Sequence, residues 1–390
     1  MMPLVKADAS TVRHVNRHVL LNLLRRERTL SRAQLRELSG LSSAAVTGVV
    51  AELIESGLVV ETSIGPSSGG RPPVILEVNY KGRAAIGLKL TEDHVGAVLT
   101  DAGANIEHAL RFPLSDHAPH SVVDVVERAV QALLDATHRP AGQLIGVGVG
   151  LPGVIDSDRG VCVHSPFMRW NDVPLVGLLE ARLGMPVVID NDVNALAAAE
   201  RLFGERQDAG HIFLATVGRG IGAGLVLGGR PYRGATGGAG EFGHTLSEHD
   251  GRACECGRRG CLEAYASETA LLARYREIKP GARTVEGFIQ ACDAQEPVAL
   301  ALLDDAGRRL GMALANAVNL LNPQLVVISG EGTRLPGRYF DGMRSALADH
   351  TFAGLRGSFD VRVEAWSEDA WARGAASLVL RRTFDPPPVP

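Results

Sequence analysis

The 390-residue chain lacks the features that mark membrane and secreted proteins. No apolar run reaches the roughly 20 residues of a membrane-spanning helix, and the N-terminus has no apolar segment of the kind that a secretory signal contains. Both absences lead us to expect a cytoplasmic protein without a membrane partner. The length favours two or three domains, and 45% hydrophobic with 22% charged residues is typical of globular domains.

Cysteine is scarce as well, with five residues in the chain. Three of them, Cys254, Cys256 and Cys261, fall within a stretch of eight residues. In a cytoplasmic protein such clustering favours metal binding over disulfides. Glycine is abundant by contrast, with 45 residues, which favours tight turns and close backbone approaches.

The formal net charge is only −4, but the charges are unevenly spread. Residues 1–83 contain 11 Lys and Arg against 7 Asp and Glu, whereas the remainder contains 29 against 37. A basic head on an acidic body is compatible with nucleic-acid binding confined to the head. A small surplus of positive charge is also common on proteins that do not bind DNA. Charge alone therefore does not decide the function.

The first eighty residues predict three helices followed by a β-hairpin. Apolar residues at helical spacing, serine N-caps and terminal glycines place the helices, and two β-rich runs flank a loop rich in Gly and Pro. The predicted helices and strands span residues 11–27, 31–38, 42–57, 58–62 and 74–78. This order is the plan of a winged helix-turn-helix domain.

In a winged helix-turn-helix, the third helix enters the major groove of double-stranded DNA and its first residues meet base edges. Ser42, Ser43 and Thr47 are polar residues available on the outer face of that helix. Arg71, in the wing, has the reach for a phosphate or the minor groove. A small module of this kind usually binds a two-fold site as a dimer. A helical adaptor for protein contacts remains the alternative.

From Ala84 onward, β-rich runs alternate with amphipathic helices. Three strands precede a long helix, a buried strand follows, and strand-to-helix and hairpin patterns recur up to a strand near residue 325. The alternation predicts an α/β body built from two similar halves. Such a fold often carries its ligand in a crevice between the halves.

The most specific pattern in the chain is GGAGEFGH at 237–244 followed by CECGRRGCLE at 254–263. With these motifs the chain resembles the ROK family, named for its repressors, open reading frames and kinases, and the resemblance extends over nearly all of it. It implies a two-lobed actin/hexokinase-like, ribonuclease H-like α/β fold behind a winged helix-turn-helix. The implied parts are the head at 1–82, a first lobe at 83–189 with 370–390, and a second lobe at 190–369 with the zinc site and dimerisation surface.

The resemblance implies one structural zinc ion per chain. The matching family residues are a His and three Cys, which here are His244, Cys254, Cys256 and Cys261. The chemistry agrees, because a closed tetrahedron of three thiolates and one imidazole is a normal structural zinc site. A reduced cysteine cluster without metal is the alternative.

The resemblance also implies a sugar site beside the zinc. Family members hold the sugar with the Glu and His of an ExGH motif and the Glu two residues after the last Cys, which match Glu241, His244 and Glu263. Zinc on one nitrogen of His244 leaves the other for the ligand. In IDNDVNALAAAE at 189–200, the family's sugar contacts match Asn191 and Asp192. A helix N-cap is the alternative interpretation of this pair.

The parts that handle phosphate in family kinases are substituted. Their DxGGT loop is replaced here by KLTED at 89–93, whose carboxylates repel a triphosphate. Arg219 stands where the kinases have Thr in a second glycine loop, and Glu331 interrupts a third. Asp192 then remains as a vestige of the kinases' general base. Phe167 replaces a sugar-binding Asn, which puts the identity of the sugar in doubt.

These observations predict a DNA-binding, sugar-responsive regulator that is not an enzyme, and we expect a repressor of carbohydrate metabolism or uptake genes. Its expected partners are a double-stranded operator, a sugar effector and further copies of the chain in a homodimer or homotetramer. An active sugar kinase that uses ATP and Asp192 is the first alternative. A body that acts as a scaffold for another protein, with the cleft as a relic, is the second.

Overall fold

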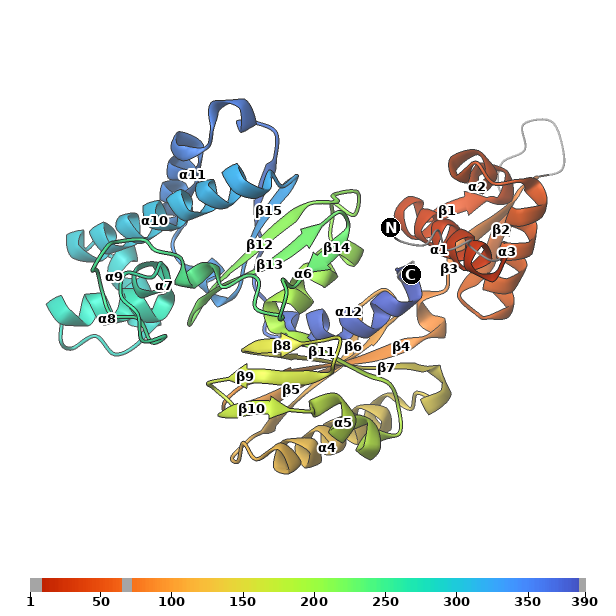
Figure 1. The fold of residues 1–390 in the computed structure, drawn as a ribbon, viewed down its shortest axis with the longest axis horizontal. Helices are drawn as coiled ribbons and strands as arrows, with labels where there is room; N and C mark the ends of the chain where they lie inside the picture. The colour runs from red at the N-terminus through yellow and green to blue at the C-terminus, as the bar shows by residue number, and fades with distance from the viewer. Residues whose placement is uncertain (1–8, 65–71, 386–390) are drawn as a thin grey trace, which may run out of the picture. The chain divides into compact units, whose positions relative to one another are not determined.

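The computed structural model describes residues 9–64 and 72–385, so Arg71, one of the predicted DNA contacts, lies outside the described residues. Contacts divide the chain into two units (Figure 1). The first contains Met1–Pro152, Ser157–Asp190 and Ala372–Pro390, and the second contains Gly153–Asp156 and Asn191–Trp371. Each unit is described by itself below.

The N-terminal part of the first unit has the three predicted helices and a small antiparallel sheet in the order β1-β3-β2. The prediction of helices followed by a hairpin is confirmed. Leu20, Leu24, Leu35, Leu53 and Leu76 are fully buried between the helices and the sheet. The elements are α1 (Ala9–Glu27), β1 (Thr29–Ser31), α2 (Arg32–Ser39), α3 (Ser43–Glu55), β2 (Val59–Ile64) and β3 (Val74–Val78).

Local capping explains why α2 and α3 begin where they do. Ser31 accepts a hydrogen bond from the backbone N–H of Gln34, whose side chain accepts one from the Ser31 N–H, which is a capping box. Ser42 caps α3 by accepting from the Ala45 N–H at 3.2 Å. Strand β1 was not predicted, because its three residues end at the serine that also begins α2.

The rest of the first unit is built on a five-stranded sheet of order β11-β7-β4-β5-β6. Its strands β4, β5 and β6 form an antiparallel meander, and β7 pairs parallel to β4. Strands β9 and β10 form a separate antiparallel hairpin. The elements are β4 (Ala84–Leu90), β5 (His94–Asp101), β6 (Ile106–Pro113), α4 (Pro119–Thr137), β7 (Leu144–Leu151), β9 (Val161–Ser165), β10 (Trp170–Val173), α5 (Leu175–Leu183) and β11 (Val187–Asn191).

The last helix, α12 (Ala370–Phe384), lies directly on two strands of this sheet. A Cβ atom on Gly87 of β4 would lie 1.9 Å from the carbonyl oxygen of Ala372, and one on Gly148 of β7 would lie 1.8 Å from that of Ala375. Only glycine permits this approach of helix backbone to strand backbone. The helix is consequently buried along most of its length.

The second unit repeats the plan with a sheet of order β14-β13-β12-β15-β16, in which β12 to β14 form the meander and β15 pairs parallel to β12. Its remaining elements are helical, apart from the short β8. The elements are β8 (Val154–Asp156), α6 (Asp192–Phe203), β12 (Ile212–Val217), β13 (Ile221–Leu227), β14 (Arg230–Tyr232), α7 (Glu263–Ala266), α8 (Glu268–Ile278), α9 (Val285–Asp293), α10 (Pro297–Leu321), β15 (Leu325–Ser329), α11 (Gly337–His350) and β16 (Asp360–Val363).

Both faces of this second sheet are covered. Alternate residues of β12 point to opposite sides, so Phe213 and Ala215 pack with the long helix α10, whereas Ile212 and Leu214 pack with α6. Short 3-10 helices connect these layers and those of the first unit at Tyr80–Gly82, Ala141–Gln143, Phe242–His244 (η3), Glu331–Arg334 (η4) and Ala353–Leu355. The predicted α/β body with two similar halves is therefore confirmed.

No single described helix has the length and apolarity of a membrane span. The helices Arg32–Ser39 and Ser43–Glu55, bent by 119°, meet those criteria only as a pair.

Candidate functional site: a cysteine and histidine cluster beside two carboxylates

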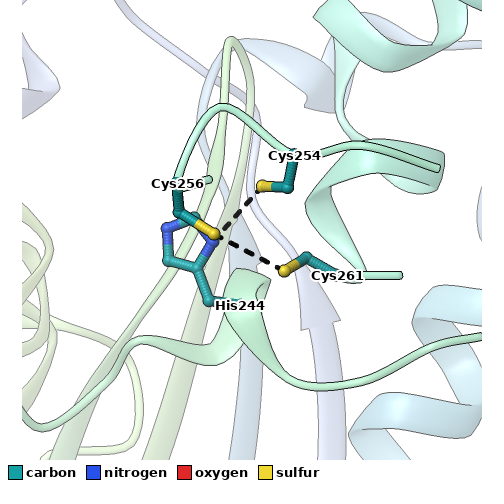
Figure 2. Close-up of side chains that lie close together, drawn as sticks. All are labelled: His244, Cys254, Cys256 and Cys261. Atoms are coloured by element: carbon teal, nitrogen blue, oxygen red, sulfur yellow. Dashed lines mark hydrogen bonds between the residues drawn. The ribbon is translucent and has the colours of Figure 1, made fainter. Parts of the chain in front are cut away.

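The four predicted metal ligands lie together in the second unit (Figure 2). The ligand atoms of His244, Cys254, Cys256 and Cys261 are all within 4.8 Å of one another. Cys254 Sγ lies 3.6 Å from His244 Nδ1, and Cys256 Sγ lies 3.7 Å from Cys261 Sγ. Ligands about 2.3 Å from a tetrahedral zinc ion are separated by about 3.8 Å. The residues present therefore fit a single tetrahedral metal ion.

The loop that presents the cysteines is folded by its own backbone. The Cys254 N–H donates to the Arg258 carbonyl, and the Gly257 N–H donates back to the Cys254 carbonyl, which closes a tight turn. Gly257 has φ +85°, a backbone conformation that residues other than glycine rarely adopt. The turn holds Cys254 and Cys256 on one side. An isolated antiparallel β-bridge between Leu246 and Cys261 brings the third cysteine to them.

The three thiols differ in acidity. Burial and the neighbouring thiols raise the pKa of Cys254 to about 12 and also raise the pKa of Cys261. Burial opposes ionisation of Cys256 too, but hydrogen bonds from Arg258 lower the pKa of Cys256 to about 7. A bound cation requires thiolates, so metal binding at this cluster displaces protons and is pH-dependent.

His244 lies between the cluster and a carboxylate. It belongs to η3, and while its Nδ1 faces the sulfur of Cys254, its Nε2 lies 3.8 Å from Glu241 Oε2. The half-exposed Glu241 precedes η3 directly. The ring thus has one nitrogen facing the cysteine sulfur and the other facing the Glu241 carboxylate, and a sugar contact at Nε2 stays a prediction.

Glu263 also lies beside the cluster, at the start of α7. Its Oε2 accepts the Ile221 N–H at 2.8 Å, and its Oε1 lies 4.0 Å from Cys254 Sγ. One carboxylate oxygen is therefore fixed by the turn between β12 and β13. The structure brings Glu241, His244 and Glu263 together around the cysteine loop.

Asn191 and Asp192 lie where β11 passes into α6. Asn191 is the N-cap of α6: its Oδ1 accepts from the N–H groups of Val193 and Asn194, and its Nδ2 donates to the Gly153 carbonyl. Asp192 is the first helical residue and is 8% exposed. The structure therefore realises the N-cap alternative at Asn191, and a ligand role for either side chain stays a prediction.

Strand β13 supports both halves of the predicted site. A Cβ on Gly224 would lie 2.6 Å from the Val193 carbonyl, so α6 packs closely on the strand. A Cβ atom on Gly240 would lie 2.0 Å from the Ala223 carbonyl oxygen, and one on Gly243 would lie 2.1 Å from that of Ile221. The η3 segment therefore packs closely on β13 as well. Gly240 and Gly243 of the GGAGEFGH motif are thus needed for packing, and they fix Glu241 and His244 along β13.

The segments that resemble phosphate loops are occupied by acidic side chains. Between β4 and β5, the Thr91 hydroxyl and the His94 ring hydrogen-bond to Asp93, and these contacts lower the pKa of that carboxyl. At the glycine loop after β12, a Cβ on Gly218 would lie 2.3 Å from Glu331 Oε2. Carboxylates at both places oppose a phosphate group by charge.

Sequence reasoning missed the residue that holds Glu331. The Trp371 indole N–H donates to Glu331 Oε1 at 2.9 Å, from the first turn of α12. Its ring also makes an edge contact with Trp366. The two tryptophans near the C-terminus are a weak signal on their own, because nothing in the sequence pairs them with residue 331.

On the predicted DNA-binding helix, the outward face of α3 contains only small side chains from Ser43 to Ala51, and the exposed Glu55 ends the helix. Ser43, Ala44, Thr47, Gly48 and Ala51 are all exposed. A Cβ atom added at Gly48 would meet nothing within 4 Å. Ser42 is exposed too, with its oxygen already used as the cap of the helix. The helix backbone therefore has unobstructed access to a surface such as a DNA groove.

Comparison with known proteins identifies the family. The ROK family model matches residues 85–382. The xylose repressor of Bacillus subtilis is 31% identical over 379 residues, covering 97% of this chain and 98% of that protein. The Escherichia coli dual regulator NagC is 30% identical over 383 residues, covering 96% and 94%.

Solved structures agree with this relationship. A ROK family transcriptional regulator described as a homolog of the Escherichia coli MLC protein superposes with a TM-score of 0.83 at 25% identity, covering 96% of this chain and 98% of its own. A ROK hexokinase from Thermus thermophilus superposes with a TM-score of 0.67 at 30% identity, covering 77% of this chain and 99% of its own. The match of the family model, the curated repressors and these structures show that the chain belongs to the ROK family.

Proposed function

We propose that this chain is a sugar-responsive transcriptional repressor whose body binds a sugar effector without phosphorylating it. The observation that carries the proposal is the Glu331 carboxylate against Gly218, because a fixed negative charge there disfavours a nucleotide while leaving the residues around His244 free for a sugar. The full-length similarity to repressors supports the regulatory role.

The effector site would use Asn191, Asp192, Glu241, His244 and Glu263. Carboxylates and the His244 Nε2 are hydrogen-bonding groups suited to a ligand with several hydroxyls. The relatives are named for xylose and N-acetylglucosamine, so D-xylose and N-acetylglucosamine are the first sugars to test. Phe167, half-buried in the first unit, offers a ring face where a sugar-binding amide is expected.

One structural zinc ion per chain would be held by His244 Nδ1 and the thiolates of Cys254, Cys256 and Cys261. When bound, zinc cross-links the η3 segment to the cysteine loop. His244 would then keep one ring orientation, with Nε2 directed toward Glu241, because its other nitrogen is fixed. The distances between the four ligand atoms support this assignment.

The head, residues 1–82, would bind a double-stranded operator through α3 and the wing. Ser42, Ser43 and Thr47 would meet base edges or phosphates, and Arg71 would reach a phosphate or the minor groove. The small side chains of α3 support a close approach of the helix to the groove floor. The two lobes, 83–189 with 370–390 and 190–369, would form the effector-binding body.

A homodimer, or a homotetramer built from dimers, would present two heads to a two-fold operator. A groove of about 520 Å³ runs along α10 beside the cysteine loop and supports this proposal. Met312, Asn316 and Leu320 follow one another at helical spacing along it, and Leu320 is 84% exposed. The occupant we propose is the same groove of a second copy, because a two-fold axis pairs identical stripes.

The test uses the full chain and DNA that it selects from a random double-stranded library. Thermal unfolding with a sugar panel, and operator affinity measured by anisotropy with and without each sugar, are expected to identify one sugar that changes both. The proposal fails if no mono- or disaccharide changes either quantity. ATP consumption that requires a sugar and is lost in Asp192→Asn would instead establish the active kinase.

A further inference from the structure

The helix that begins with the proposed sugar ligand Glu263 is only one turn long. It is α7, Glu263–Ala266, and a single turn forms too few hydrogen bonds to offset the cost of fixing its backbone. Its place therefore depends on contacts with other elements. Ala266 belongs to the hydrophobic core that α10 helps to form, and its carbonyl accepts from the buried Tyr339 hydroxyl at 2.9 Å. A further anchor is the side chain of Tyr265, two residues after the carboxylate.

Tyr265 is 4% exposed and contacts two arginines. The guanidinium of Arg309, on α10, lies 4.1 Å from the centroid of its ring, and that of Arg274, on α8, lies 5.7 Å from it. The hydroxyl oxygen accepts the Arg252 backbone N–H at 2.6 Å, just before the first cysteine of the cluster. A Cβ atom on Gly251 would lie 2.0 Å from that oxygen, so a glycine leaves room for the hydrogen bond. Tyr265 thus connects α7 to α10 and to the cysteine loop.

Arg309 also holds the segment that follows His244. Its Nη1 donates to Ser247 Oγ at 3.2 Å, and its Nη2 donates to Glu248 Oε2 at 2.8 Å. Its side chain is 22% exposed, and its Nε donates to Asp305 at 3.0 Å, which balances the charge. The donors of a guanidinium have a fixed planar geometry. One side chain therefore sets this segment and the ring below it at fixed positions on α10.

Asp305 joins the two arginines on Tyr265 into one network. Its Oδ2 accepts from Arg309 and also from Arg274 Nη2, at 2.7 Å. Arg274 in turn donates through Nη1 to the Tyr265 carbonyl at 2.9 Å. The neighbouring Arg308 donates to the other oxygen of Asp305 with a side chain that is 63% exposed. A partly buried polar network whose members are satisfied is rigid, so it fixes α7 against α10.

We propose that Arg309 is a positioning residue that, through the ring of Tyr265, sets the place of the sugar ligand Glu263. Its contacts with the segment after His244 set the place of a second ligand. The inference rests on the proposed function, because it assigns both ligands to the sugar. Hydrogen bonds weaken steeply with misalignment, so the spacing of the two ligands decides which sugar hydroxyls they reach together. Arg309 touches no sugar in this proposal and acts on selectivity through its partners.

The test compares Arg309→Met with Arg308→Met. Both arginines belong to α10, bond to Asp305 and line the α10 groove, so the control matches charge, helix and assembly. Each chain is titrated by calorimetry with D-xylose, N-acetylglucosamine and the panel sugar that most stabilises the parent chain. Arg309→Met is expected to lose at least tenfold in affinity for the best sugar, to change the ratio between the best two sugars at least threefold, and to keep its zinc. Arg308→Met is expected to keep parental affinities.

Arg309→Lys keeps the positive charge over the ring and is expected to recover at least threefold of the lost affinity. A structural role alone would lower Tm and leave the sugar affinity of the folded chain unchanged. Parental affinity in Arg309→Met, or an equal loss in Arg308→Met, therefore overturns the inference. Tyr265→Phe serves if Arg309→Met folds poorly. It removes the acceptor of the Arg252 N–H and is expected to lose at least threefold, and parental affinity there also contradicts the proposal.

Hydrogen exchange gives a readout that does not depend on a sugar. Exchange at residues 247–252 and 263–266 is expected to be at least tenfold faster in Arg309→Met and parental in Arg308→Met. Unchanged exchange in Arg309→Met overturns the inference. A parent chain that binds no sugar refutes the proposed function, and the exchange experiment still decides whether Arg309 holds the two segments.

Discussion

The Trp371 indole holds the Glu331 carboxylate at 2.9 Å, and that carboxylate occupies the space directly above Gly218. Two residues 40 positions apart thus keep a negative charge at the glycine loop that follows β12. An anionic ligand that enters this loop has to displace the Glu331 side chain from its hydrogen bond with Trp371. It is also repelled by the negative charge of that carboxylate. The loop keeps the glycines of a phosphate site but has a carboxylate held against the first of them.

Replacing this glutamate is expected to reopen the loop. Glu331→Gly removes the carboxylate and frees the space over Gly218, so binding of ATP, absent or weak in the parent chain, is expected to strengthen at least tenfold. Calorimetry with ATP measures it. Glu368→Gly, at an exposed glutamate of the same unit, is the control and is expected to leave ATP binding unchanged. Equal ATP affinity in all three chains would show that Glu331 does not guard the loop.

Loss of one metal ligand is expected to destabilise the second unit. Cys261→Ala is expected to reduce zinc from one ion per chain to none. The free energy of unfolding falls by about 3 kcal/mol and Tm by roughly 6–12 °C for a unit of this size. Metal analysis and calorimetric unfolding measure both quantities. Cys292→Ala, at a buried cysteine outside the cluster, is the control for side-chain loss and is expected to keep its zinc.

The Glu241 carboxylate is expected to bind the sugar and not to support the fold. Its side chain is 56% exposed, so Glu241→Ala removes hydrogen bonds to a ligand with little effect on Tm. A lost hydrogen bond to a charged group is worth about 1.5–3 kcal/mol, which is roughly 10- to 150-fold in sugar affinity. Calorimetric titration measures it, with Glu255→Ala in the exposed cysteine loop as the control. A parental sugar affinity in Glu241→Ala would remove this residue from the site.

A substitution on the outer face of α3 is expected to separate DNA binding from stability. Gly48→Glu places a carboxylate where nothing lies within 4 Å, so operator affinity is expected to fall more than tenfold by repulsion from phosphates. The fold gains about 0.5–1 kcal/mol, because glycine is a poor helix former. Gly177→Glu, at an equally open glycine of α5, is the control and is expected to gain stability while keeping DNA affinity. Equal DNA affinity in both variants would exclude α3 as the recognition helix.

A buried carboxyl at the end of α6 makes stability depend on pH. Burial, together with the neighbouring Glu364 carboxylate, raises the pKa of Glu200 to about 8, well above the ordinary value for a glutamate, although Arg362 opposes the shift. The folded chain therefore holds this proton more tightly than the unfolded chain. The stabilisation is fully present below the unfolded pKa and is lost as pH rises through the folded pKa.

The measurement is Tm between pH 6 and 9. The parent chain is expected to lose stability across this range, and Glu200→Gln, which keeps the neutral shape, is expected to lose less. Glu205→Gln changes an exposed partner of the same Arg362 and is expected to follow the parent curve. Identical slopes for the parent chain and Glu200→Gln would show that Glu200 is ionised throughout.

The predictions from the sequence succeeded where spacing along the chain determines proximity in space. His244, Cys254, Cys256 and Cys261 lie within 18 residues, and a short loop brings them together without help from the rest of the fold. Caps such as Ser31 and Ser42 are local for the same reason. At Asn191, the sequence left a cap and a ligand contact open, and the structure shows the cap.

The contacts that sequence reasoning missed join distant segments. Nothing near Glu331 in the sequence indicates that Trp371 donates a hydrogen bond to it. Likewise, nothing near Asn22 indicates that its side chain donates to the carbonyl of Phe384. Both contacts are made by residues of α12, and local pattern does not encode where a helix docks. The three-residue β1 was missed because so short a strand is defined by its partner β3.

The close fit of α12 on Gly87 and Gly148 has a consequence for how the protein is made. Strands β4 and β7 leave the ribosome more than 200 residues before the helix that covers them. Until α12 has been synthesised, the strip of that sheet around Gly87 and Gly148 lacks the helix that covers it. The first lobe, although translated early, therefore completes its core only when α12 is available, and a truncation that removes α12 uncovers strands made near the beginning of the chain.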